Sequence, residues 1–389
     1  VEAPQAEARQ CVGTEQPQTE GPHRHKKRQR GENLPAPARS PTHEANLVPC
    51  AAAPLPASRC GFPGWRIREG GAARWPGNWC GSIISGGRGA IWRAALDLAA
   101  YLGDRKSRVD RALDAALPPR RPDPGRLVEA MRYTLMLPGK RIRAIVCLAA
   151  AEAFSGRERD VLPLAVSVEF VHAASLILDD LPSFDDAMRR RGSPTNHRVF
   201  GEAVAVLASV SLLAAAFRHL AEQSRPRWIG PDDGIGSVRD LAEAIGENGM
   251  VAGEALDLLA RGARPGLAEL ERIHALKTGS LFIACAGEAA RISGAGPTEQ
   301  AALRAYAKNL GLAFQITDDL LDVLGDAGTT GKDHAKHAEG ANFVTFAGVD
   351  GARRLTDELI DTAVQSLAPL GRRGATLEAI ARYVGRRDK

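Results

Sequence analysis

The chain has 389 residues, 44% of them hydrophobic, which is enough for one large domain or two smaller ones. Its net charge of +5 comes from the N-terminal segment: Lys and Arg outnumber Glu by 13 to 7 up to residue 95, whereas the remainder holds 38 bases and 39 acids. The balance gives no reason to expect a nucleic acid as a partner of the folded part.

Residues 1–92 differ in composition from the rest of the chain. They contain 11 of the 24 prolines, few periodic stretches and a basic run, His23–Arg30. Such a segment buries too little apolar surface to offset its ordering entropy, which predicts a disordered N-terminal extension. A targeting or binding tail is the alternative, although four glutamates and one arginine in the first 20 residues argue against a transit peptide.

Cysteine usage and hydropathy bear on location. Four of the six cysteines lie in the N-terminal segment at spacings that match no zinc pattern. Cys147 and Cys285 sit in apolar helical context and are expected to be buried thiols, which fits a reducing, cytoplasmic location. The longest uncharged apolar run, Ala203–Phe217, has 15 residues, fewer than the ~20 that a spanning helix needs, so no transmembrane segment is expected.

Residues 93–389 are rich in Ala and Leu, with apolar residues spaced three and four apart. Gly and Pro fall mainly between these segments, and no alternating β pattern competes. This pattern predicts one all-α domain. Because Ala203–Phe217 is apolar around most of its girth, we expect it at the centre of a helical bundle.

The first polar motif of this domain is GKRIR, Gly139–Arg143. Gly139 allows a turn or a close approach of the backbone, while Lys140 and Arg143 present N–H donors that suit phosphate oxygens. Alone the motif is weak, because basic helix starts are common. It gains meaning from the acidic clusters that follow.

The first acidic cluster ends an apolar helical segment, Val161–Asp180, and contains Asp179, Asp180, Asp185 and Asp186. Carboxylates at a helix C-terminus oppose the helix dipole and are costly to bury unpaired, which indicates a bound cation. Aligned carboxylates that face a shared cavity suit Mg²⁺, especially when the ion also holds substrate phosphates. A solvated acidic helix end is the alternative.

Residues around this cluster add geometry and positive charge. His172 and Asp179 are seven positions apart and therefore lie within about 20° of each other on one helix face. Pro182 interrupts the regular helix, which leaves Asp185 and Asp186 free to fold back towards the same ion. The basic residues that follow directly are Arg189, Arg190 and Arg191.

The second acidic cluster lies in FQITDDLLD. Asp318 and Asp322 are four apart on one helix face, with Asp319 adjacent and Gln315 one turn before. Three acids within five residues raise one another's pKa unless a cation neutralises them. Lys332 follows in TTGKD and could supply a permanent charge. A solvated acidic face is the alternative, but the segment is largely apolar.

Two short motifs lie between the clusters. MVAGEALDL (Met250–Leu258) and KTGSL (Lys277–Leu281) suggest two helices whose polar groups, including Lys277 and Thr278, enter an apolar cavity. Thr-Gly alone is ordinary helix-break chemistry. Taken together, metal-binding acids and diphosphate-binding bases predict chemistry on a diphosphate ester.

These motifs resemble those of the trans-isoprenyl diphosphate synthases, the polyprenyl synthetase family, and most of all the geranylgeranyl diphosphate synthases. The resemblance runs from about residue 95 to the end. It is carried by GKRIR, EFVHAASLILDDLPSFDDAMRRRGSPTNH, GEALDL, KTGSL, GLAFQITDDLLDVLGD, GKD and YVGRR. The first acidic motif with its following Arg-Arg-Gly and PTNH is highly specific.

The resemblance implies an isoprenoid-synthase-type bundle of mostly antiparallel helices around a deep apolar cavity, usually in a homodimer. It implies a prenyltransferase: an allylic diphosphate ionises, the double bond of isopentenyl diphosphate attacks the cation, and a proton is lost. It also implies Mg²⁺, as three ions shared with the substrate diphosphate. The metal ligands would come from Asp179, Asp180, Asp185, Asp318, Asp319 and Asp322.

The same resemblance implies roles for the other residues. Isopentenyl diphosphate would be held by Lys140, Arg143, His172 and Arg191. The allylic substrate would be attended by Arg190, Lys277, Thr278, Gln315 and Lys332. The catalytic set would be Asp179, Asp185, Lys277, Thr278, Gln315 and Asp318.

Several positions depart from the family pattern. Glu254 replaces the usual Gln and adds a negative charge near the metal site. After GKD, positions that usually hold an acid, a base and Thr hold His337, Gly340 and Asn342, which suggests weaker binding of the allylic substrate.

The resemblance also bears on product length. Ala174 and Ser175, small residues before Asp179, leave the cavity deep and favour a C20 product. The alternatives are a farnesyl or longer-chain synthase, or a catalytically weak partner subunit of another prenyl synthase. A terpene cyclase is less consistent with the sequence, because it needs no isopentenyl site and the GKRIR and Arg-Arg-Gly motifs suggest one.

Overall fold

The computed structural model describes residues 97–387 apart from residues 118–125, 224–230, 264 and 325–341. The chain divides into two units, Val1–Gly86 and Gly87–Lys389, and every described residue belongs to the second unit. The predicted disordered extension, and with it Lys332, His337 and Gly340, therefore lie outside the described residues. The bounds of the domain stay a prediction.

The described residues form helices almost throughout, as the sequence predicts. The helices before the first acidic cluster are α1 (Leu98–Ala116), α2 (Leu127–Leu135), α3 (Ile142–Glu152) and α4 (Glu158–Asp179). A short hairpin, β1 (Arg189–Arg190) and β2 (Ser193–Pro194), leads to α5 (Asn196–Phe200), α6 (Glu202–Gln223) and α7 (Pro231–Ile245). The remaining elements are α8 (Met250–Leu259), α9 (Leu267–His274), η2 (Ala275–Gly279), α10 (Ser280–Ile292), α11 (Pro297–Leu324), α14 (Phe343–Ser366), η3 (Ala368–Gly374) and α15 (Ala375–Arg386).

Side-chain caps fix the starts of two of these helices. The Asp97 carboxylate accepts a hydrogen bond from the amide of Ala100 at 3.0 Å and so begins α1. Asn342 does the same for α14 through the amide of Thr345, at 2.7 Å. An Asn cap satisfies one of the donors that a helix N-terminus leaves unpaired. Asn342, one of the departures from the family pattern, therefore has a clear structural role.

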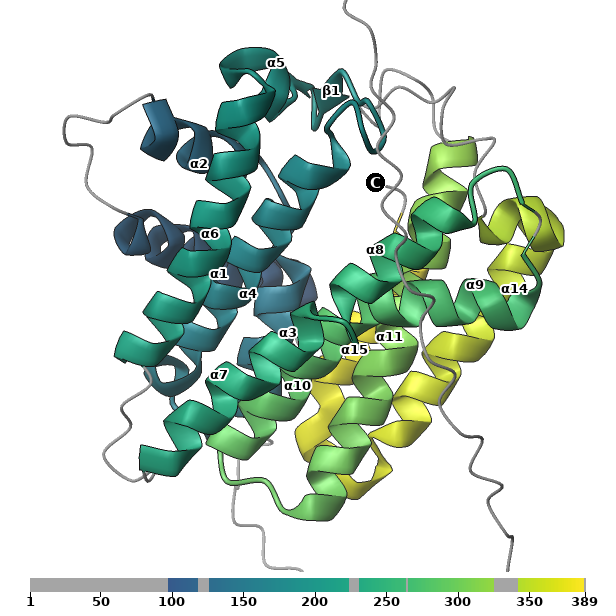
Figure 1. The fold of residues 1–389 in the computed structure, drawn as a ribbon. Helices are drawn as coiled ribbons and strands as arrows, with labels where there is room; N and C mark the ends of the chain where they lie inside the picture. The colour runs from purple at the N-terminus through teal and green to yellow at the C-terminus, as the bar shows by residue number, and fades with distance from the viewer. Residues whose placement is uncertain (1–96, 118–125, 224–230, 264, 325–341, 388–389) are drawn as a thin grey trace, which may run out of the picture. The chain divides into compact units, whose positions relative to one another are not determined.

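The helices pack as a series of neighbours, α6, α4, α3, α10, α11 and α14, that runs through the bundle (Figure 1). The main core lies between α3, α4, α10 and α11, and its largest fully buried side chains include Phe170, Phe282 and Tyr306. A second, smaller core joins α9, α11 and α14 around Leu312 and Phe343. Both predicted acidic clusters lie on helices of this series, at the ends of α4 and α11.

The expectation that α6 lies at the centre of the bundle is wrong. Its inner face packs on α4, where Ala205 and Ala208 are fully buried, but Val206, Leu207 and Val210 on its outer face are 38%, 56% and 56% exposed. Hydropathy alone does not distinguish a central helix from one whose apolar outer face this chain leaves open.

Two helices, α4 and α6, are long and apolar enough to cross a membrane if only length and composition are considered. In the bundle, 67% of the apolar window of α4 is buried, as in the core helix of a folded domain, against 39% for α6. The outer face of α6 is thus the more exposed of the two apolar surfaces.

Close packing of α8 on η2 depends on a glycine. A Cβ atom at Gly253 would lie 2.1 Å from the backbone nitrogen of Lys277, and the backbone cannot move away as a flexible side chain could. Gly253→Ala is therefore expected to lower the free energy of unfolding by about 1–3 kcal/mol, as overpacking does elsewhere. Urea denaturation measures this change.

A matched control lies in α1. Gly103 occupies a helix interior with no other atom within 4 Å of its added Cβ, so Gly103→Ala should stabilise the protein by about 0.5–1 kcal/mol. Equal effects of the two substitutions would contradict the close approach of α8 and η2.

Candidate active site

The chain folds back on itself directly after α4. The amide of Asp185 donates to the carbonyl of Asp179 at 2.9 Å, and the amide of Ala187 donates to that of Asp180 at 3.2 Å. Asp186 has a φ of 47°, a left-handed conformation that non-glycine residues seldom adopt. The return of the chain that Pro182 was expected to permit is therefore present, and it brings Asp185 beside the end of the helix.

Arginines from other segments hold these carboxylates. Asp180 is 2% exposed, and both its oxygens accept from the Nε of Arg190 at 2.8 Å. Asp185 accepts from the guanidinium of Arg261 at 2.6 Å, and Arg261 also donates to the carbonyl of Phe184. Charge-assisted bonds of this kind compensate the cost of burying a carboxylate. Arg261 lies in the loop after α8 and was not predicted from the sequence.

A tight hairpin presents the arginine pair. β1 and β2 are antiparallel, with Arg190 opposite Ser193, and the two residues of the turn, Arg191 and Gly192, have φ values of 52° and 79°. Positive φ at both central positions is the pattern of a type I′ turn. The guanidinium of Arg191 then packs over Gly139, where a Cβ atom would lie 2.6 Å from it. The RRG and GKRIR motifs are thus in direct contact, and Gly139 permits that approach.

The bases of GKRIR divide between two roles. Arg141 turns inward, where its guanidinium bonds Asp110 at 2.8 Å and Glu169 at 3.3 Å. Arg143 lies 3.5 Å from the Nε2 atom of His172 on α4, so the structure brings these two predicted residues together. Burial lowers the pKa of Arg143, and burial with nearby arginine charges lowers that of His172. His172 is therefore neutral and can accept or donate a hydrogen bond.

The other predicted bases lie close by. Lys140, in the same segment, is half-buried. The pKa of Arg191 falls to about 10 because of burial and the neighbouring arginine charges. The half-buried arginine charges gathered around Arg191 favour an anion as ligand.

Lys277 lies in a π-helical turn, a feature that often occurs at functional sites. Its ammonium group contacts Glu254 and Asp257 of α8, each at 2.6 Å. Burial alone would lower the pKa of Lys277, but the charges of Asp179, Asp257 and Glu254 outweigh it and raise the value. The other carboxylate oxygen of Glu254, Oε1, is buried and has no hydrogen-bond partner among the described residues.

A chain of hydrogen bonds joins the KTGSL motif to the second acidic cluster. Thr278 donates to the side-chain oxygen of Gln315 at 3.0 Å, and Gln315 donates to Asp319 at 3.0 Å. The other oxygen of Asp319 accepts from the backbone amide of Phe343 at 3.1 Å. The structure thus brings the predicted residues Thr278, Gln315 and Asp319 together, and the start of α14 fixes the last of them.

The C-terminal end of the described chain reaches Asp318. Arg387 donates to this carboxylate at 2.6 Å and to the carbonyl of Phe314 at 2.9 Å, and its guanidinium lies 3.8 Å from the centre of the Phe314 ring. Asp322, one turn further along α11, is half-buried. Burial raises the pKa of Asp179 and of Asp319 to about 7, so a nearby cation is needed to keep both ionised at neutral pH.

The side chains present suit Mg²⁺ in chemical type. The donors are carboxylate oxygens, the hard ligands that Mg²⁺ prefers, and the buried, unpaired oxygen of Glu254 lies within the same group of charges. Within the part of the chain that is described, no three Asp, Glu, His or Cys side chains converge closely enough to hold an ion by themselves. Mg²⁺ commonly takes one or two carboxylates together with waters and substrate phosphates, so this arrangement fits an ion that arrives with a diphosphate.

Sequence reasoning missed three contacts of this site. Arg387 lies in the YVGRR motif and Asp257 in GEALDL. Both motifs were recognised in the sequence, but no function was predicted for these two residues. Arg261 carries no local signal, because only the approach of the loop after α8 to the end of α4 creates its contact. Lys332 lies outside the described residues, and the roles of the predicted site residues stay predictions.

The comparisons with known proteins agree with this geometry. The sequence matches the polyprenyl synthetase family over residues 124–349. It is 40% identical to geranylgeranyl pyrophosphate synthase 12, chloroplastic, of Arabidopsis thaliana, over 75% of this chain and 81% of that one. It is 39% identical to the heterodimeric geranylgeranyl pyrophosphate synthase large subunit 1, chloroplastic, of the same plant, over 76% and 81%. The crystal structure of an FPP/GFPP synthase from Zymomonas mobilis matches with a TM-score of 0.67 at 34% identity, over 75% of this chain and 99% of that one.

The contact between Arg387 and Asp318 can be tested by mutation. Arg387→Gln removes a buried guanidinium that bonds a carboxylate and covers an aromatic ring, so the free energy of unfolding should fall by about 1–3 kcal/mol. The adjacent Arg386 is exposed, and Arg386→Gln should change stability by less than about 0.5 kcal/mol. Urea denaturation in chelator-treated buffer measures both, and similar small effects would mean that Arg387 does not hold Asp318 in solution.

Proposed function

The chain belongs to the polyprenyl synthetase family, and on that basis we propose that it condenses isopentenyl diphosphate head to tail with an allylic diphosphate to give geranylgeranyl diphosphate. The predicted prenyltransferase activity is confirmed at the level of the family and its curated relatives. The observation that carries the proposal is the pairing of two acidic clusters, on α4 and α11, with a group of half-buried bases between GKRIR and the RRG hairpin.

The bases divide between two diphosphates in this proposal. Lys140, Arg143, His172 and Arg191 would bind isopentenyl diphosphate, which is supported by the contact of Arg191 with Gly139 and of Arg143 with His172. Arg190 and Lys277 would bind the allylic diphosphate, for which they must exchange carboxylate partners for phosphate oxygens. A guanidinium fork matches phosphate as well as it matches carboxylate, so the exchange keeps its hydrogen bonds.

Magnesium would neutralise the charge that accumulates on the leaving diphosphate as its C–O bond breaks. We propose three ions, with Asp179 and Asp185 as ligands at the first cluster and Asp318 at the second. Asp180 and Asp319 already accept hydrogen bonds from Arg190 and from Gln315 with Phe343. Asp185 and Asp318 likewise accept bonds from Arg261 and Arg387, so all four carboxylates would exchange these partners when the ions bind, and Asp180, Asp319 and Asp322 stay proposed as further ligands.

The residues of this chain would also protect the allylic cation. Thr278 and Gln315 form a hydrogen-bonded pair whose oxygen dipoles can face developing positive charge. Phe282 and Phe314 lie next to each other, with ring centres 5.5 Å apart, beside Arg143. Apolar walls of this kind exclude the water that would quench a carbocation. The released diphosphate can accept the proton.

Product length is proposed from the residues that precede Asp179. Ser175 is half-buried and lies one helical turn before Asp179, on the face that also carries His172. Ala174 is fully buried, and its carbonyl accepts a hydrogen bond from Ser209 of α6. Small side chains here leave room for a long product. A farnesyl or longer-chain product remains the alternative, since the Zymomonas mobilis relative is an FPP/GFPP synthase by its title.

A homodimer is also part of the proposal. The outer face of α6, formed by Val206, Leu207 and Val210, is an exposed apolar patch of the kind that marks an interaction surface. One relative is named as the large subunit of a heterodimer. A cytoplasmic location stays a prediction from cysteine usage; the names of both plant relatives carry the word chloroplastic.

The second candidate function is a catalytically weak partner subunit of another prenyl synthase. The ion pairs of Lys277 with Glu254 and Asp257 favour it, because they compete with the allylic diphosphate for that lysine. Activity of the purified chain alone separates the two functions.

The direct test is an incubation of the purified chain with Mg²⁺, isopentenyl diphosphate and each of the C5, C10 and C15 allylic diphosphates. We expect a C20 product, sized by chromatography, and none in the presence of a chelator. A product of another length would correct the chain-length proposal only. No product from any primer would favour the partner subunit.

Replacement of Ser175 tests the chain-length proposal. Ser175→Phe places a ring on the face of α4 that carries His172 and Asp179, so the main product should shorten from C20 towards C15. Ser175→Ala keeps the position small and should leave product length unchanged. If both variants still give C20, the face of α4 at position 175 does not limit the growing chain.

A further inference from the structure

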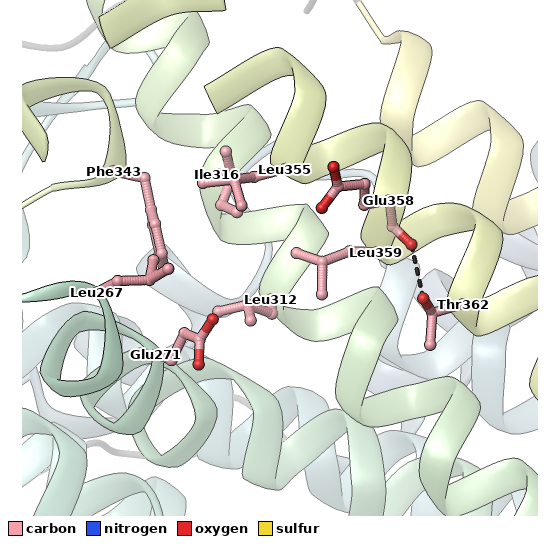
Figure 2. Close-up of a pocket in the computed structure, with 9 residues that line it drawn as sticks. All are labelled: Leu267, Glu271, Leu312, Ile316, Phe343, Leu355, Glu358, Leu359 and Thr362. Carbon is pink, nitrogen blue, oxygen red and sulfur yellow. Dashed lines mark hydrogen bonds between the residues drawn. The ribbon is translucent and has the colours of Figure 1, made fainter. Parts of the chain in front are cut away.

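A pocket lies between α9, α11 and α14, beside the candidate active site but separate from it. Its cavity volume is about 160 Å³. Figure 2 shows the buried side chains of Leu312, Ile316 and Phe343 and, next to them, Leu355 and Leu359 of α14. A cavity of about 150 Å³ can hold a ligand the size of benzene, so this pocket has room for a small organic molecule only.

The rim of the pocket carries negative charge. Glu271 of α9 and Glu358 of α14 are exposed lining residues, and Thr362 lies beside Glu358 (Figure 2). Neither carboxylate forms an ion pair with another residue in the described parts of the chain. Two carboxylates at the edge of an apolar floor, neither in an ion pair with another described residue, favour a cation over an anion as ligand.

The floor of the pocket is shared with the support of the second acidic cluster. Ile316 follows Gln315 on α11, and the amide of Phe343 is the group that holds Asp319. The Phe343 ring also lies 5.2 Å from the ring of His274, three residues before Lys277. The pocket therefore occupies the face of α11 next to the one that carries the acids.

We propose that this pocket binds a small amphiphilic cation, with an alkyl or aryl body on Leu312, Ile316 and Phe343 and an ammonium group at the rim, near Glu271 or Glu358. The proposal goes beyond the proposed synthase function and does not depend on it, because it concerns neither substrate. Its two requirements, apolar body and positive charge, can be separated with matched probes.

The probes are hexylamine, hexanol and hexanoate, which share one alkyl chain and differ in charge. Their dissociation constants for the full chain can be measured by saturation-transfer NMR without turnover. We expect hexylamine to bind at least fivefold more tightly than hexanol and hexanoate more weakly than either. Equal binding of amine and acid, or no binding of the amine to folded protein, would overturn the proposal.

Variants place the binding site. In the double variant Glu271→Gln with Glu358→Gln, hexylamine should lose its preference over hexanol, while Asp357→Asn, an exposed neighbour on α14 outside the pocket, should leave that preference unchanged. Leu359→Trp fills the pocket and should weaken both probes at least fivefold. If this variant does not fold, the loss of amine preference in the double variant tests the location by itself.

The substrate site also contains carboxylates and is the competing location for the amine. Hexylamine binding that survives the double variant and is instead displaced by farnesyl diphosphate with Mg²⁺ would place the amine in the substrate site and refute the pocket. Binding that is lost in the double variant and unaffected by the diphosphate supports it. Loss of synthase activity would change neither result.

Discussion

The structure depends on the compensation of buried and half-buried carboxylates by cations from other segments of the chain. Asp180 is held by Arg190 and Asp318 by Arg387, and Lys277 is held in turn by Glu254 and Asp257. An uncompensated carboxylate inside a helical bundle would cost several kcal/mol, so these contacts are a condition for placing the clusters where they are. They also bring ends of α4, α8, α11 and α15 to one region.

The same contacts explain how the site can serve two charged ligands. A diphosphate offers the bases the oxygen acceptors that the carboxylates now supply, and a divalent ion offers the carboxylates the positive charge that the bases now supply. In the proposed function, binding of both together would exchange partners without leaving a buried charge unpaired. In this account Glu254 stands out, because its second oxygen is buried without a partner among the described residues and its first would compete with the diphosphate for Lys277.

Much of this architecture could be predicted from the sequence. Apolar spacing gave the helices, and Pro182 indicated the break after which Asp185 returns to the end of α4. The sequence indicated only that Gly139 allows close packing. That Arg191 is the residue packed against it came from the structure. Arg261 and the inward turn of Arg141 could not be foreseen, because their partners are set by tertiary packing. The position of α6 was misjudged for a physical reason: a helix apolar on all sides can face the core or an open surface.

The central claim is that acids and bases form one site for a metal diphosphate, and calorimetric titration with inorganic pyrophosphate tests it most directly. The account predicts that pyrophosphate binds the purified chain at least tenfold more tightly with Mg²⁺ than with chelator, and that Asp318→Asn reduces this gain. Pyrophosphate binding that is equally tight without Mg²⁺ would show that the bases act alone, and it would contradict the account.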